Sequence, residues 1–149
     1  MRAELQTMAC SLGLADAVRF AGAVPQAELA RWYSAADLLL LASSREGWPN
    51  VLLEAMACGT PVVASRVGGV AEVVSSSLLG AAVPILNAGQ LAHAVLEVLA
   101  TLPDRAAIRR HAQDMGWASV SNAQQEMFAR VVAGHGGAPL SPQKGLDHA

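Results

Sequence analysis

The sequence is poor in charge and has almost no lysine. Charged residues make up 15% of the 149 residues, ten lysines and arginines stand against twelve aspartates and glutamates, and Lys144 is the single lysine. The formal net charge of −2 gives no broad positive field of the kind that binds nucleic acid or acidic membrane surfaces. We therefore expect no nucleic acid among the partners.

Long hydrophobic runs are also missing. The longest uninterrupted apolar stretch, Leu38 to Ala42, is far shorter than the roughly 20 residues of a membrane-spanning helix. The amino-terminal residues carry Arg2 and Glu4 and contain no sustained apolar segment. We therefore expect no transmembrane segment, no secretory signal and a cytoplasmic location.

Cysteine is scarce as well. Cys10 and Cys58 have neither CxxC spacing nor a matching histidine cluster. This pattern argues against a zinc site and against a disulfide framework.

The chain does contain enough apolar material for one globular domain. Hydrophobic residues make up 53% of its length, and 149 residues lie within the roughly 100 to 200 that a single domain needs. We predict one domain over residues 1–133 and a mobile tail over residues 134–149, where four glycines and two prolines occur without apolar periodicity.

Short apolar runs alternate along this domain with stretches of helical periodicity. The runs predict strands at residues 18–22, 38–42, 61–65 and 81–84. The helical stretches lie at residues 1–13, 25–36, 50–58, 70–74, 90–102, 104–114 and 117–132. Such alternation is typical of βαβ units, so we predict an α/β fold with a parallel sheet flanked by helices.

Parallel sheets of this kind bind ligands at the carboxyl ends of their strands. The loops at residues 22–25, 43–50 and 65–69 follow predicted strands, and none of them is a GxGxxG or P-loop motif. The Gly68-Gly69 pair in the third loop either lets the backbone approach a ligand closely or simply makes the turn.

The second loop and the helix after it carry two carboxylates, Glu46 and Glu54, with seven residues between them. The predicted helix N-terminus between them has free N–H groups and a positive dipole end, which favour an anion such as a pyrophosphate. A carboxylate only accepts hydrogen bonds, so its natural partner in such a cleft is a pair of sugar hydroxyls. One carboxylate for each sugar of a nucleotide sugar fits this spacing. A solvated loop residue at Glu46 and a surface helix residue at Glu54 fit the spacing equally well.

The residues around the carboxylates narrow this choice. The segment EGWPNVLLEAMACGTPVVA, from Glu46 to Ala64, closely resembles the ExxxxxxxE segment of glycosyltransferase family 4, the group 1 glycosyl transferases. The segments LGLADAVRFAG, YSAAD and VGGVAEVV resemble the same family, so that the resemblance covers about residues 10 to 85.

The resemblance implies a Rossmann-like domain that forms one half of a GT-B fold. It implies retaining transfer of a hexose from a nucleoside diphosphate sugar, with no metal and no cofactor. Glu46 would face the transferred sugar as the catalytic residue, and Glu54 would accept hydrogen bonds from the ribose hydroxyls. The other donor-binding residues would be Ala23 and Val24 beside the base, and Gly47, Trp48, Asn50 and Val51 at the sugar and phosphates.

Two of the implied contacts have a second interpretation. Trp48 could stack on the donor, but aromatic area more often packs a loop against the core. Pro49 has no N–H group, so one potential donor to the phosphates is absent from the loop.

The resemblance does not extend to the family's first domain or to the opening βα unit of its second domain, which supplies an Arg and a Lys to the diphosphate. We therefore expect a donor-binding fragment that is inactive alone, with a saccharide or lipid acceptor bound by the missing amino-terminal domain. That missing half could also place the protein at the periphery of the inner membrane. A non-catalytic nucleotide-sugar-binding module and one half of a two-chain transferase, completed by a partner chain or by self-association, remain alternatives. A nucleotide-sugar epimerase, which shares the GT-B architecture, is a third.

Overall fold

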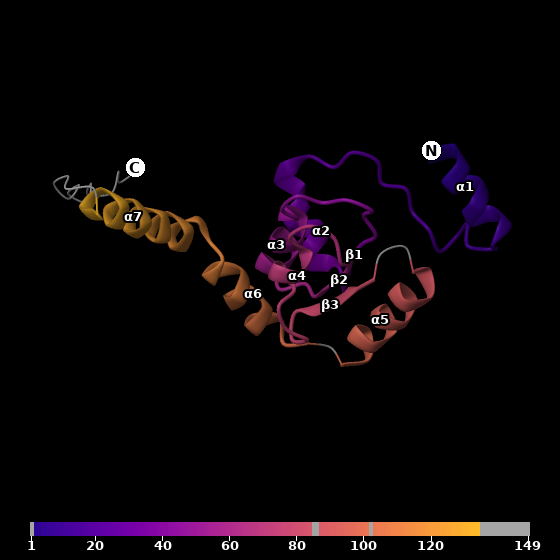
Figure 1. Ribbon diagram of the computed structural model, residues 1–149. Helices are drawn as coiled ribbons and strands as arrows, with labels where there is room; N and C mark the ends of the chain where they lie inside the picture. Colours follow the sequence, from indigo (N-terminus) through magenta and orange to yellow (C-terminus); the bar gives the residue numbers. More distant parts are fainter. Residues whose placement is uncertain (1, 85–86, 102, 135–149) are drawn as a thin grey trace.

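The computed structural model describes residues 2–84, 87–101 and 103–134 (Figure 1). Its elements are α1 (Arg2–Ser11), α2 (Gln26–Ala35), β1 (Leu39–Leu41), α3 (Asn50–Ala57), β2 (Val62–Ser65), α4 (Val70–Val73), β3 (Gly80–Val83), α5 (Ala88–Thr101), α6 (Arg105–Asp114) and α7 (Trp117–Gly134). Apart from Gly134, the predicted tail lies outside the described residues. Within the described ranges, no helix combines the length and hydrophobicity that crossing a membrane requires.

The three strands form one parallel sheet in the order β1-β2-β3. Leu39 pairs with Val62 and Val62 with Gly80, so the strands end at the same edge. Helix α5 packs on one face of β2 and β3, whereas α3 packs against α6 and the other face (Figure 1). The predicted α/β fold with a parallel sheet flanked by helices is confirmed.

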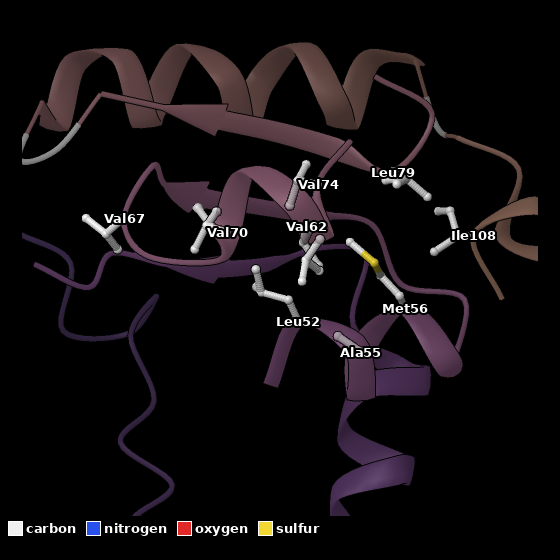
Figure 2. Close-up of a cluster of buried hydrophobic side chains, with 11 residues drawn as sticks. Leu52, Ala55, Met56, Val62, Val67, Val70, Val74, Leu79 and Ile108 are labelled. Carbon is white, nitrogen blue, oxygen red and sulfur yellow. The ribbon is translucent and has the colours of Figure 1, made fainter. Parts of the chain in front are cut away.

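The central strand β2 organises the core because both of its faces are covered. All four of its residues are buried. Val62 and Ala64 belong to the cluster with Leu52, Met56 and Ile108 that Figure 2 shows, while Val63 joins the cluster beneath α5. Alternate side chains of a strand point to opposite faces, so a continuous apolar run suits this position.

The predicted strand at residues 18–22 is wrong. No element spans these residues, and the free edge of β1 has no pairing partner among the described strands. The segment belongs to the long connection from α1 to α2 (Figure 1). Within this connection, the carbonyl of Phe20 accepts a hydrogen bond of 3.0 Å from the Arg2 guanidinium. A strand is held by hydrogen bonds to a neighbour, and the β-prone Val18 and Phe20 cannot replace that neighbour.

Two arginines of helix α6 form hydrogen bonds with the carboxyl ends of α2 and α3. Arg105 donates hydrogen bonds to the carbonyls of Ser34 (2.9 Å) and Ala36 (3.1 Å) and to Oγ1 of Thr60 (3.0 Å). Arg109 does the same at the end of α3, with two bonds of 3.2 Å to backbone carbonyls. Helix carboxyl ends carry unpaired carbonyls and a negative dipole end, which a guanidinium satisfies.

Replacing Arg105 with alanine should lower the free energy of unfolding by about 1.5 to 3 kcal/mol, because hydrogen bonds to a charged group are lost at a helix end. Urea denaturation followed by circular dichroism measures the change. Arg110→Ala is the matched control, since the Arg110 side chain is 68% exposed and its ion pair with Asp104 is 3.8 Å long. The control should change stability by less than about 0.5 kcal/mol; equal losses from the two substitutions would contradict a tethering role for Arg105.

Candidate functional site

The loops that follow β1 and β2 lie against each other at the carboxyl edge of the sheet. The first loop carries Glu46 and leads into α3, and the second carries Gly68 and Gly69 and leads into α4. The N–H of Gly69 donates a hydrogen bond of 2.9 Å to the carbonyl of Gly47. The structure therefore brings together two of the three loops in which the sequence placed a binding site.

The two glycines of the second loop permit this approach. Gly68 has a φ of +48°, and a Cβ atom built there would lie 1.9 Å from the carbonyl oxygen of Glu46. A Cβ atom on Gly69 would lie 2.7 Å from the ring of Trp48. The absence of side chains at Gly68 and Gly69 thus lets the Glu46 loop and the Trp48 ring pack directly against the second loop.

Trp48 lies beside Gly69 yet remains 46% exposed. Its ring therefore packs on the second loop and also leaves area open at the carboxyl edge of the sheet. Both roles that the sequence suggested for Trp48 are compatible with this position.

Helix α3 begins at Asn50, immediately after the buried Pro49. No side-chain hydrogen bond caps this end of the helix. The N–H of Asn50 donates to the carbonyl of Trp48 (3.0 Å) and that of Leu52 to the carbonyl of Pro49 (3.0 Å), so two backbone donors are used within the turn. Gly47, Trp48, Asn50 and Val51, predicted at the sugar and phosphates, all lie at this uncapped end.

Glu54 lies one turn inside α3 and is half-buried. Its Oε2 atom accepts a hydrogen bond of 3.1 Å from the hydroxyl of Tyr33 on α2. Burial, followed by the hydrogen bond and the charge of Glu54, raises the pKa of the Tyr33 phenol above its ordinary value of 10.0. The phenol is therefore a neutral hydrogen-bond donor throughout the physiological range.

The sequence did not reveal this partnership. Leu29, Trp32, Tyr33 and Ala36 recur at helical spacing, which makes Tyr33 part of an apolar stripe. Tyr33 also begins the YSAAD segment that resembles the family. Its ring does pack against the core cluster, but its hydroxyl reaches Glu54, 21 positions away. Neither the helical spacing nor the YSAAD segment identifies Glu54 as the partner of the Tyr33 hydroxyl.

The remaining predicted residues occupy separate positions. Glu46 is half-buried in the loop after β1, whereas Ala23 and Val24 lie in the loop that leads into α2, the helix of Tyr33. A hollow of about 650 Å³ lies elsewhere, beside α1, and its lining includes Arg2, Cys10 and Phe20. Within the described part of the chain, no cluster of three or more His, Cys, Asp or Glu could hold a metal ion.

Comparison with known proteins gives consistent matches. Residues 1–115 match the family model described as "Glycosyl transferases group 1". The D-inositol 3-phosphate glycosyltransferase 2 of Catenulispora acidiphila is 40% identical over 134 residues, which are 87% of this chain and 31% of that protein. The D-inositol 3-phosphate glycosyltransferase of Thermobispora bispora is 38% identical over 133 residues, or 86% of this chain and 31% of that protein. The chain thus spans less than a third of the length of these relatives.

Two solved structures share the fold. The sucrose-phosphate synthase of Thermosynechococcus elongatus superposes with a TM-score of 0.74 at 32% identity, covering 89% of this chain and 35% of that one. The carboxyl-terminal domain of a group 1 family glycosyl transferase from Francisella tularensis gives a TM-score of 0.64 at 28% identity, with coverage of 76% and 58%.

Proposed function

Because the chain belongs to the group 1 glycosyl transferases, we propose that it is the donor-binding part of a retaining hexosyltransferase that uses a nucleoside diphosphate sugar. The family membership and the half GT-B fold that the sequence predicted are both confirmed. The donor, the mechanism and the residue roles are the proposal.

The proposal rests on the position of Glu54 and on the groups around its carboxylate. Its half-buried carboxylate is held by Tyr33, one turn inside a helix whose amino-terminal end carries no side-chain cap. A carboxylate needs hydroxyl or N–H donors, and an uncapped helix end attracts an anion. The ribose of a nucleoside diphosphate offers two hydroxyl donors, and its diphosphate offers an anion at a spacing of about one helical turn.

The other residues follow from this placement. Glu46 would contact the hydroxyls of the transferred hexose, and Gly47, Trp48, Asn50 and Val51 would line the sugar and the phosphates. Ala23 and Val24 would border the base. As the bond from sugar to phosphate breaks, the helix end would stabilise the charge that grows on the departing diphosphate, as preorganised dipoles do at other developing anions.

Transfer by the whole enzyme would also require a part that this chain does not span, since the chain covers 31% of the length of the relatives. Residues 1–133 would form the donor-binding domain, and a saccharide or lipid acceptor would bind to the part of the transferase that this chain does not span. We further propose a cytoplasmic enzyme that reaches the membrane only through that other part.

The 149-residue chain should bind a nucleoside diphosphate sugar but should not transfer the sugar on its own. Calorimetric titration with UDP-glucose, GDP-mannose and ADP-glucose tests the binding, and release of the nucleoside diphosphate in the presence of saccharide or lipid acceptors tests the transfer. Binding without transfer is expected. Absence of binding to all three would overturn the donor assignment, and turnover of about 1 to 1,000 per second would overturn the division of labour between the two parts.

A further inference from the structure

Tyr33 is anchored independently of the carboxylate that it contacts. Its backbone carbonyl accepts a hydrogen bond of 2.6 Å from Oγ1 of Thr60. The Thr60 Oγ1 atom in turn accepts a hydrogen bond of 3.0 Å from Arg105. The Tyr33 ring packs against the core cluster that contains Leu52 and Met56. The phenol hydroxyl is therefore presented from a fixed scaffold.

The Glu54 side chain has no comparable rigidity of its own, because it rotates about several bonds. The Tyr33 hydroxyl takes one acceptor position on Oε2 and thereby limits the orientations of the carboxylate. Each carboxylate oxygen has two acceptor positions, so Oε1 and the second position on Oε2 stay available to a pair of hydroxyls. Restricting a binding group before the ligand arrives lowers the entropic cost of binding.

We propose that Tyr33 is a positioning residue, whose phenol holds the Glu54 carboxylate in the orientation that accepts the two ribose hydroxyls of the nucleotide donor. The inference rests on the proposed function, since it assigns Glu54 to the ribose. It differs from a purely architectural role, in which the hydrogen bond would only join α2 to α3.

The first test combines a protein variant with a ligand variant. ADP, GDP and UDP are titrated against the full chain, and the tightest binder is compared with its 2′,3′-dideoxy form. Tyr33→Phe keeps the ring and removes the hydroxyl, so it should weaken binding of the ribose form by about 3- to 10-fold, the effect of one ordinary hydrogen bond. The same substitution should leave binding of the dideoxy form unchanged. The neighbouring Trp32→Phe is the control and should change neither affinity.

The outcomes separate the two proposals. If the wild-type chain binds the ribose and dideoxy forms equally, the ribose role of Glu54 in the proposed function is wrong. If the wild-type chain prefers the ribose form but Tyr33→Phe weakens both forms equally, the hydroxyl acts only through the architecture and the positioning role is wrong. If no nucleotide binds, both proposals fall.

A second test reads the contact without any ligand. Tyr33 is the single tyrosine of the chain, so the ultraviolet absorbance of tyrosinate reports on it alone. Glu54→Gln keeps the shape of the side chain and removes its charge, and it should lower the pKa of Tyr33 toward the ordinary value. Glu97→Gln, an exposed carboxylate on α5, is the control and should not change it. An unchanged titration in Glu54→Gln would overturn the contact and with it the positioning role.

Discussion

Alanine at Glu54 should weaken the binding of both a plain nucleoside diphosphate and a sugar nucleotide by about 10- to 100-fold. In its proposed role, Glu54 is a carboxylate acceptor for two ribose hydroxyls, and hydrogen bonds to charged groups contribute roughly 1.5 to 3 kcal/mol. The substitution also leaves the Tyr33 hydroxyl without its partner. Since both ligands carry the same ribose, both should lose affinity to the same extent.

Glu46→Ala should behave differently. If Glu46 faces the transferred hexose, its loss should weaken only the sugar nucleotide and leave the plain diphosphate nearly unchanged. Calorimetric titration of both variants with both ligands measures the difference, and Glu97→Ala on α5 serves as the control. Equal losses of diphosphate affinity from the two substitutions would mean that the assignment of one carboxylate to each sugar is wrong.

Alanine at Gly80 should lower the free energy of unfolding by about 4 kcal/mol or more. Single substitutions reach such losses only when they create a severe steric conflict or a comparable defect. Gly80 begins β3 with a φ of +134°, and a Cβ atom there would lie 1.7 Å from the carbonyl oxygen of Val62 on β2. The strands must separate to admit the methyl group. Because single domains are stable by only about 5 to 15 kcal/mol, such a loss removes a large part of the total.

Gly13 offers the matched control for this prediction. It also has a positive φ, +70°, but a Cβ atom there meets nothing within 4 Å. Gly13→Ala should therefore cost only about 1 to 2 kcal/mol, the penalty of the left-handed conformation itself. Urea unfolding of the two variants separates backbone strain from steric conflict, and similar losses would refute the conflict between β2 and β3.

The sequence was sufficient to predict the elements whose residue pattern depends on their own burial. We could predict β1, β2 and the helical stretch from Leu91 to Val98, because burial requires apolar residues at regular positions in each of them. The segment at residues 18–22 has the composition of a strand as well. Its conformation depends on a pairing partner elsewhere in the chain, which composition does not report.

The candidate site shows the same division. The motif from Glu46 to Glu54 was readable because its residues are contiguous. The contact between Tyr33 and Glu54, and the approach of Gly68 to Glu46, join segments that are 21 or more positions apart. Such contacts follow from how α2, α3 and the loops are packed, and no periodicity within one segment encodes them.

The bonds that Arg105 makes at the carboxyl end of α2 bear on the order in which the chain matures. Their acceptors, Ser34 and Ala36, lie 71 and 69 positions earlier in the sequence. Contacts of such long range form late, because a large loop must close before they contribute. During synthesis, the carboxyl end of α2 can therefore bond to Thr60 before it bonds to Arg105, which becomes available only after α6 has emerged from the ribosome. The last bonds at the end of the helix that carries Tyr33 thus come from a residue that lies 69 to 71 positions further along the chain.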